Sequence, residues 1–194
     1  ELSKTFHGKN IIYTSRKQLN ILDLKSIDRC FEKYKPNYLI HLASLSRPMI
    51  IHEKDICQSI DANIIGTANI VKKCSEKNIK LIYFSTNYVY PGSKGNYKET
   101  DFADSQDFYG RSKFYGEVQN ENTLVLRISV IGRELTTNRG LIEWFLQQQD
   151  VNGFLNAIFS GLPSVSIGNF IIHYLTLCQR KAGLFHLSAD PISK

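Results

Sequence analysis

Hydrophobic and polar positions follow two different periods along this chain, and each change of period predicts a new element. Short apolar runs rich in β-branched and aromatic residues, bounded by turn formers, indicate buried strands. The runs that predict strands are residues 11–13, 38–43, 79–85, 123–130 and 184–187, and residues 21–24 mark a further position at the sheet edge. Apolar residues three or four positions apart indicate amphipathic helices between these runs.

Two of the predicted helices are defined by their apolar faces. The first begins after an N-cap at Ser26, carries Ile27, Cys30, Phe31 and Tyr34 on one face, and is stopped by Pro36. The second runs from about Asp55 to Lys77. Its predicted face consists of Ile56, Ile60, Ile64, Thr67, Val71 and Cys74. Further helices are predicted around Tyr109, capped by Asp107 or Ser105, and over residues 141–148 and 170–178.

Strands that alternate with helices predict a parallel sheet, because each crossover helix packs on a face of that sheet. The fold class is therefore α/β, a doubly wound sheet with helices on both faces. We expect one such domain over residues 1–133 and part of a smaller, substrate-binding lobe over residues 134–194, where the pattern loosens.

The most informative chemistry lies in Thr86, Tyr109 and Lys113. Thr86 follows an apolar run, so its hydroxyl is expected at the carboxyl end of a buried strand, where α/β sheets bind ligands. Tyr109 and Lys113 are four residues apart on a predicted helix and share one face. A charge about 4 Å from the phenol, at an effective dielectric of about 20, is worth about 4 kcal/mol and would bring its pKa towards neutrality. The three residues predict a site for proton and hydride transfer.

Tyr109 and Lys113 also have a structural interpretation. A Tyr-x-x-x-Lys spacing occurs by chance in many helices, and Lys113 could instead pair with Glu117, four residues further on. The strand end before the helix and the alternating pattern around it favour catalysis.

Composition excludes several other classes. The chain has 194 residues, of which 42% are hydrophobic and 22% charged, as in ordinary globular domains. No apolar run is long enough to span a bilayer, and residues 1–9 do not resemble a signal peptide, so we expect a cytoplasmic protein without a membrane partner. A net charge of +6 is spread without a basic block, which argues against nucleic acid.

The cysteines and histidines predict neither disulfides nor a metal site. Cys30, Cys57, Cys74 and Cys178 have no Cys-x-x-Cys spacing and fall among apolar helix positions, as expected of reduced, buried thiols. The five histidines lie in different elements. We therefore predict no metal.

Several segments resemble the extended short-chain dehydrogenase/reductases that act on nucleotide sugars, in particular those like dTDP-4-dehydrorhamnose reductase. The resemblance covers residues 11–132 and, more faintly, 183–187, and it implies a Rossmann-like fold. The residues that it implies at the cofactor are Asp23, Leu24, His41, Leu42, Ala43, Ser44, Asn63, Ser85, Tyr109, Lys113 and Arg127. Those that it implies at the substrate are Thr86, Asn87, Tyr109, Ile128 and Ser129. Structural alternatives stand beside these roles: Gly66 can serve close helix packing alone, and Asp23 can cap a turn.

One departure from the family concerns the phosphate-binding turn. Members open with a strand and a Gly-x-x-Gly-x-x-Gly turn, whereas this sequence starts with residues that resemble the end of the following helix. We therefore expect a fragment of a longer protein, or one with parts missing.

The resemblance implies a nicotinamide cofactor, and residues after the first predicted strand indicate which one. NAD-preferring relatives carry an acidic residue where this chain has Ser15, Arg16 and Lys17. A hydroxyl and two cations suit a 2′-phosphate, so NADPH is expected over NAD; the alternative is a solvated loop.

By analogy, the expected activity is NADPH-dependent reduction of a 4-keto-6-deoxy sugar linked to a nucleotide, for surface polysaccharide synthesis. Asn87 and Tyr88 replace the acidic pair of the dehydratases, which disfavours dehydration. A nucleotide-sugar epimerase and a non-catalytic, NADP-binding regulatory subunit are the alternatives. The resemblance also allows a homodimer.

Overall fold

The structure is a computed structural model that describes residues 10–46, 50–134, 140–177 and 181–193. By their contacts these residues fall into two compact units. The first comprises Ile12–Arg127 and residues 181–186, and the second comprises residues 128–134 and 140–177 with 10–11 and 187–193. Each unit is described by itself.

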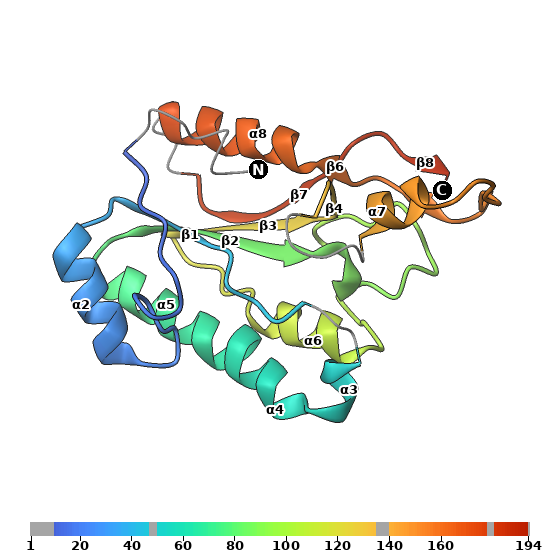
Figure 1. Cartoon of the computed structure of the whole chain (residues 1–194). Helices are drawn as coiled ribbons and strands as arrows, with labels where there is room; N and C mark the ends of the chain where they lie inside the picture. The colour runs from blue at the N-terminus through green and yellow to red at the C-terminus, as the bar shows by residue number, and fades with distance from the viewer. Residues whose placement is uncertain (1–9, 47–49, 135–139, 178–180, 194) are drawn as a thin grey trace. The chain divides into compact units, whose positions relative to one another are not determined.

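A four-stranded sheet is the centre of the first unit (Figure 1). Its strands are β1 (Tyr38–His41), β2 (Lys80–Thr86), β3 (Thr123–Ile128) and β7 (Gly183–Leu187), in the order β1-β2-β3-β7. β1 and β2 run parallel, with Tyr38 opposite Lys80 and His41 opposite Tyr83. Their carboxyl ends therefore open onto the same edge of the sheet, as predicted for a parallel α/β fold.

The helices of the first unit lie between these strands in the sequence. They are α2 (Leu24–Tyr34), α3 (Ile51–Lys54), α4 (Ile56–Ser59), the π-helical segment η1 (Ile60–Ile65), α5 (Gly66–Glu76), the 3₁₀ turn η2 (Asn87–Val89) and α6 (Phe108–Tyr115). Figure 1 shows α2, α4, α5 and α6 on the same side of β1 and β2. The predicted helix over residues 55–77 is thus three consecutive segments, of which α4 and α5 are α-helical and η1 between them is π-helical.

Helix α2 begins earlier than the sequence predicts. Asp23 is its N-cap, and Oδ1 of Asp23 accepts a hydrogen bond from the Lys25 amide at 2.9 Å. The predicted N-cap, Ser26, lies inside the helix. Its hydroxyl accepts a hydrogen bond from the Asn20 amide, which precedes the helix. The helix ends at Lys35, which adopts a left-handed conformation just before Pro36.

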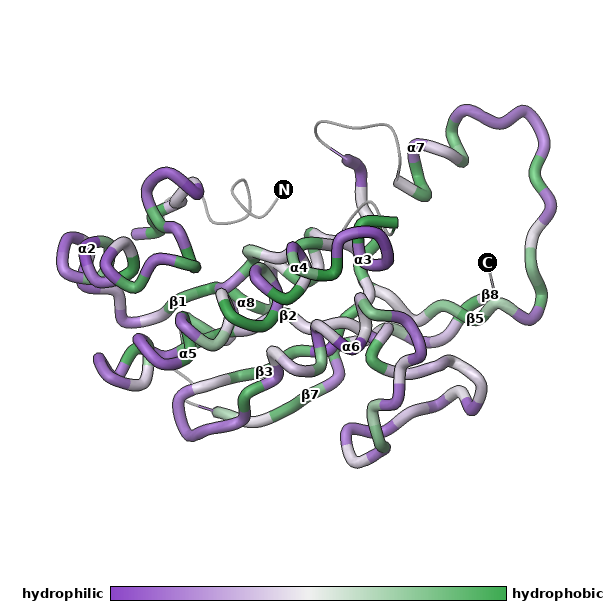
Figure 2. The backbone as a smooth tube through the Cα atoms, turned by 90° about the horizontal axis from the view of Figure 1, so that it is seen from below, coloured by the Kyte–Doolittle hydropathy of each residue, from purple (hydrophilic) through white to green (hydrophobic). Residues whose placement is uncertain are grey.

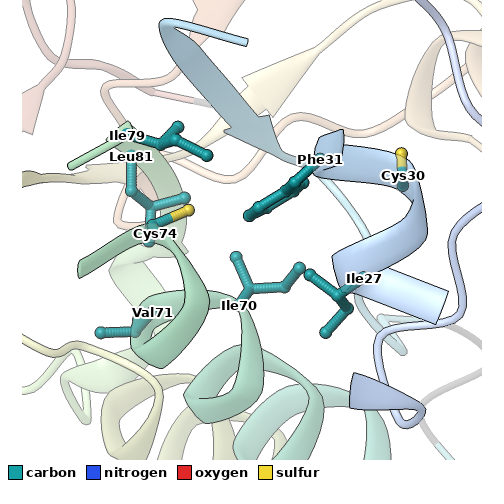
Figure 3. Close-up of a cluster of buried hydrophobic side chains, with 8 residues drawn as sticks. All are labelled: Ile27, Cys30, Phe31, Ile70, Val71, Cys74, Ile79 and Leu81. Carbon is teal, nitrogen blue, oxygen red and sulfur yellow. The ribbon is translucent and has the colours of Figure 1, made fainter. Parts of the chain in front are cut away.

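The core beneath the sheet joins α2, α5 and β2. Figure 2 shows α2 as a mostly hydrophilic helix, so few apolar side chains hold it to the fold. Ile27 and Phe31 of α2 meet Ile70 of α5 in a buried cluster (Figure 3). Cys30, Val71, Cys74, Ile79 and Leu81 complete this cluster. Burial of Ile27, Ile70 and their neighbours removes apolar surface from water, which is the main force that holds these elements together.

Three sequence predictions in this unit are wrong. Residues 11–13 form no strand, because none of the described strands pairs with them, and Ile12 and Tyr13 are exposed. Residues 21–24 form a turn that leads into α2 rather than a position at the sheet edge. Cys57 is exposed, whereas Cys30 and Cys74 are buried as expected, and burial raises the pKa of the Cys74 thiol to about 12.

The second unit contains short elements. β4 (Val130–Ile131) pairs in parallel with β6 (Leu162–Pro163), and β5 (Ile158–Phe159) pairs antiparallel with β8 (Ile192–Ser193). Its helices are α7 (Leu141–Leu146) and α8 (Ser164–Thr176). α8 starts at Ser164, six residues before the predicted position 170. Cys178 lies outside the described residues. The first nine residues, where the end of a helix was expected, also lie outside them. Among the helices that the structure describes, none has the length and apolar character to cross a membrane.

Candidate functional site

Strand β2 presents Thr86 at its carboxyl end. The strand is buried along its length after Lys80, and Thr86 itself is 6% exposed. The Thr86 hydroxyl accepts a hydrogen bond from the Tyr88 amide at 3.2 Å and donates to Oδ1 of Asn87 at 3.4 Å. Thr86 therefore caps the η2 turn, and this fixes its side chain where the sheet edge is expected to bind a ligand.

Helix α6 carries Tyr109 and Lys113 and packs against the residues that follow Thr86. Its N-cap is Asp107, as predicted, with Oδ1 accepting from the Gly110 amide at 2.7 Å. A Cβ atom at Gly110 would lie 2.1 Å from the carbonyl oxygen of Tyr88. Only glycine allows this approach, so the residue after Tyr109 sets the distance between the helix and the end of β2.

The Lys113 ammonium is buried beside β2. Its Nζ donates to the carbonyl oxygen of Phe84 at 2.8 Å and lies 4.5 Å from the centre of the Tyr83 ring. Burial lowers the pKa of Lys113 to about 8, against the opposing effect of the Glu117 carboxylate. The side chain is thus mostly charged at neutral pH. The carbonyl group that binds it belongs to Phe84, two residues before Thr86 on the strand.

Tyr109 lies between two other rings. Its centroid is 5.0 Å from that of His52 and 5.9 Å from that of Tyr88, which meets it edge-on. His52 is 1% exposed, and its Nδ1 is 2.7 Å from the Ser59 hydroxyl. Burial lowers the pKa of His52, although Ser46 and Asp107 act in the opposite direction. No spacing between residues points to His52, which comes from a separate short helix, α3.

Asn63 joins the loop after β1 to helix α6. Its Oδ1 accepts from the Ser44 hydroxyl at 3.1 Å and the Leu45 amide at 2.8 Å. Its Nδ2 donates to the Leu45 carbonyl and the Ser112 hydroxyl, both at 2.9 Å. Because these four bonds use the ordinary capacity of the amide, Asn63 positions the neighbouring segments through its side chain. It occupies the π-helical segment, a rare conformation that is frequent at functional sites.

His41 ends β1 with its ring buried. Its Nε2 is 3.1 Å from the Thr67 hydroxyl of α5, and its ring stacks on Tyr83 at 5.7 Å. Burial, with a contribution from the Lys113 charge, lowers the pKa of His41 to about 4. The imidazole is therefore neutral at physiological pH.

Glu117 does not serve as the hydrogen-bonding partner of Lys113. Its two carboxylate oxygens accept from Arg127, at 2.9 Å from Nε and 2.6 Å from Nη2. The Ser85 hydroxyl also donates to Glu117, at 2.5 Å. The four-residue spacing suggested that Lys113 pairs directly with Glu117, and this alternative is wrong. The charge of Glu117 nevertheless acts to raise the pKa of Lys113.

The remaining residues expected at a cofactor differ in exposure. Leu42, Ala43 and Ser44 form an exposed run directly after β1. Ser15, Arg16 and Lys17 lie in an exposed turn, where Ser15 bonds Gln18. Asp23 caps α2 and Leu24 is 37% exposed. In contrast, Ser85 and Arg127 point their polar groups into the protein.

Two residues expected at the substrate belong to the second unit. Ile128 is buried at the end of β3, and the Ser129 carbonyl accepts from the Leu162 amide at 2.9 Å. Asn87 is exposed beside Thr86 in the first unit. Among the described residues, no group of three or more His, Cys, Asp or Glu side chains is arranged to hold a metal ion.

The sheet, its helices and the polar groups at its carboxyl edge define a Rossmann-like α/β protein. The chain belongs to the RmlD substrate binding domain family, whose model matches residues 1–190. The family resemblance seen in the sequence is thereby confirmed.

The known proteins that are similar to the chain include methionine adenosyltransferase subunits and dTDP-4-dehydrorhamnose reductases. The methionine adenosyltransferase 2 subunit beta of Xenopus tropicalis is 31% identical over 117 residues, which are 58% of this chain and 35% of that protein. A dTDP-4-dehydrorhamnose reductase ortholog from Clostridium acetobutylicum has a TM-score of 0.84 at 21% identity, covering 99% of this chain and 71% of that one. The dTDP-4-dehydrorhamnose reductase of Bacillus anthracis in complex with NADP has a TM-score of 0.82 at 22% identity, covering 98% and 72%. At these identities the two structures show the shared fold.

The matched region is a part of the longer relatives. The chain spans about a third of the length of the methionine adenosyltransferase subunits that it matches.

Proposed function

We propose that the chain is part of an enzyme that reduces a keto group on a nucleotide-linked deoxy sugar with NADPH, in the manner of a dTDP-4-dehydrorhamnose reductase. The observation that carries this proposal is the placement of Lys113 against β2. A buried ammonium bound to the Phe84 carbonyl brings the helix of Tyr109 to the strand end of Thr86. The proposed product is a building block for surface polysaccharide.

The residues present fit a nicotinamide cofactor along the edge of the sheet. Leu42 to Ser44 are exposed after β1, at the edge where such ligands bind in α/β sheets. The turn at Ser15, Arg16 and Lys17 is exposed and carries two cations that suit a 2′-phosphate. These features support NADPH over NAD, and the NADP-bound relative of Bacillus anthracis supports the same cofactor class.

Three side chains would act on the sugar. Thr86 would donate a hydrogen bond to the ketone oxygen and orient it. A reduced nicotinamide, when bound along this edge of the sheet, would supply the hydride for the carbonyl carbon. Tyr109 would give its proton to the oxygen as negative charge develops there, and the Lys113 ammonium would stabilise the phenolate that remains. One proton and one hydride then account for the alcohol that is formed.

The roles of the other side chains follow from their contacts. Nε2 of His41 and the side-chain amide of Asn63, both residues expected at the cofactor, are engaged inside the protein, so we assign the two residues to positioning. Ser85 and Arg127 meet at Glu117 and are assigned in the same way.

Turnover tests the proposal directly. The full-length protein with NADPH and a panel of nucleotide-linked 4-keto-6-deoxy sugars should consume NADPH, as followed at 340 nm. Tyr109→Phe should reduce kcat/KM by about 10² to 10⁴ because the proton donor is lost. The matched control is Tyr115→Phe, on the same helix but 63% exposed, which should keep full activity.

A regulatory role is the second candidate, and the similarity to methionine adenosyltransferase subunits favours it. It predicts tight binding of NADPH with no turnover of any sugar in the panel. An epimerase would instead form product with no net change in absorbance. Equal activity of Tyr109→Phe and the unchanged protein would exclude the mechanism given above.

A further inference from the structure

His52 is a buried ionisable side chain that has no role in the reaction proposed above. It belongs to α3, which packs against α4 and α6 (Figure 1). The residue is 1% exposed, and burial lowers the pKa of its ring, so the imidazole is neutral at physiological pH. A neutral, buried ring acts on its surroundings through packing and hydrogen bonds.

The Ser59 hydroxyl anchors this imidazole. It lies 2.7 Å from Nδ1 of His52, and Ser59 is fully buried on α4. The Ser46 backbone and the charge of Asp107 raise the pKa of the ring, yet among the described residues Nε2 has no hydrogen-bond partner. The contact with Ser59 therefore restrains the rotation of the ring, and Nε2 adds no hydrogen bond to it.

The unpaired nitrogen makes a histidine unfavourable at this position. A polar atom that leaves water without finding a partner loses hydrogen bonds that folding does not replace. An apolar side chain could fill the same space between α4 and α6 without that loss. Packing alone therefore does not explain His52, and a buried polar atom of this kind is often found at functional sites.

The imidazole packs against the ring of Tyr109. The two centroids are 5.0 Å apart, with 50° between the ring planes. Tyr88 meets the Tyr109 ring edge-on at 5.9 Å, but Tyr88 is 51% exposed, whereas His52 is buried and anchored. The imidazole is thus the firmer of the two neighbours that determine the direction of the phenol.

We propose that His52, anchored by Ser59, is a positioning residue that orients the phenol of Tyr109 for proton transfer. The proposal rests on the proposed function, in which Tyr109 is the proton donor. Proton transfer needs the donor and acceptor atoms within about 3 Å of each other. A displacement of about 1 Å can reduce the rate about 100-fold. A ring that holds the phenol in one direction therefore acts on the rate of reaction and not on cofactor binding.

Two variants separate the ring from its anchor. His52→Asn removes the ring but keeps an amide that can bond to Ser59, whereas Ser59→Ala keeps the ring and removes the hydroxyl. Both should lower kcat by about 10- to 100-fold and leave the KM for NADPH unchanged. The double variant should lose no more than the larger of the two single losses, because the two residues act as a unit.

A second measurement observes Tyr109 without turnover. In protein with isotope-labelled tyrosine rings, the NMR signals of Tyr109 are those that disappear in Tyr109→Phe. Protons of the Tyr109 and Tyr88 rings should give a nuclear Overhauser cross-peak, because the two rings are in edge-on contact. We expect this cross-peak to weaken in His52→Asn and in Ser59→Ala, although neither change touches Tyr88.

A third variant guards against loss of the fold. Ser59→Ala removes the partner of Nδ1 and leaves a buried polar atom behind. His52→Leu combined with Ser59→Ala replaces both polar side chains by apolar ones, which proteins tolerate better. This variant has no imidazole, so it should show the same loss of kcat and the same weakened cross-peak as His52→Asn.

The matched control is Thr123→Val. The buried Thr123 hydroxyl donates to Oδ1 of Asn120 at 2.9 Å, so this change also removes one hydrogen bond of a buried hydroxyl. Thr123 lies at the start of β3, where the Asn122 carbonyl accepts from the Leu81 amide near the start of β2. The end of β2 that carries the site is at the other edge. Thr123→Val should leave kcat and the cross-peak unchanged.

Because the cross-peak needs no turnover, the two proposals fail separately. A weakened cross-peak in a protein that reduces no sugar would keep the orienting contact of His52 and reject the reductase function. If an active protein kept both kcat and the cross-peak in His52→Asn and Ser59→Ala, the role of His52 would be rejected while the reductase function stands. A change in only one of the two measurements would also overturn the proposal, since orientation and rate would then be unconnected.

Discussion

His41 and Lys113 are ionisable side chains that the fold buries, and the charge of Lys113 acts on His41. His41 is held neutral, with a pKa of about 4, while Lys113 keeps most of its charge near neutral pH with a pKa of about 8. Both values lie below those of the free side chains, so both groups make the stability of the protein depend on pH.

Acidification should remove the contribution of His41. Below pH 6.5 the unfolded chain takes up a proton on His41, whereas the folded chain does so only near pH 4. The contribution of His41 to the free energy of unfolding is therefore fully present above pH 6.5. It is lost as the pH falls towards 4, by up to about 3 kcal/mol. Urea unfolding of the protein and His41→Gln should show the difference in their free energies shrinking across this window. Parallel curves for His41→Gln and the unchanged protein would contradict the assignment.

Residue identity alone gave Thr86, Tyr109 and Lys113 but not their surroundings. Glu117 was visible through its spacing, yet its engagement with Arg127 depends on a strand that follows later in the sequence. His52 approaches Tyr109 only because α3 and α6 come together in space. No local pattern carries such contacts, and a sequence can reveal them only once the fold is known.

Helix α6 depends on its first turn for its position. Asp107 accepts from the Gly110 amide and from the Ser105 hydroxyl, and so fixes the start of the helix two residues before Tyr109. Asp107→Ala should lower the free energy of unfolding by about 1 kcal/mol. It should also reduce turnover, because the first turn carries the proton donor. Asp104→Ala, an exposed change three residues earlier, should change neither, and an equal effect of both would argue against capping.

The sequence pattern predicts the elements whose buried side chains are apolar. It does not predict the elements that bury polar side chains. β2 and the cap of α6 match their patterns. Along α4 and η1, the buried positions are Ser59 and Asn63, while the predicted Ile56 is 43% exposed. Ser59 is hydrogen-bonded to His52, and Asn63 is hydrogen-bonded to Ser44. These hydrogen bonds offset the free-energy cost of burying the two polar side chains. Gly66 meets Ile21 closely, which supports its packing interpretation.

At the scale of the molecule, cofactor choice should appear as a difference in thermal stability. A ligand at 100 times its dissociation constant stabilises the folded state by about 2.7 kcal/mol. NADPH should therefore raise the unfolding temperature more than NADH at equal concentration, if the exposed cations at Arg16 and Lys17 receive the 2′-phosphate. Arg16→Glu should remove the difference, whereas Lys77→Glu, an equal charge change at the exposed C-cap of α5, should preserve it. If the Arg16→Glu variant were still stabilised more by NADPH than by NADH, the turn would be a solvated loop that does not bind the 2′-phosphate.

The wide turn at Ile60–Ile65 has a consequence for how this sequence can vary. A π-helical turn holds one more residue than an α-helical one between the same two end points. The chain could lose one amino acid there, and the turn could tighten, while α4 and α5 kept their places. What would change is which side chain faces inward, and that inward place now belongs to Asn63. A length difference between homologous chains at this spot would therefore report a change in the hydrogen bonds that join the loop after β1 to helix α6, rather than a different architecture.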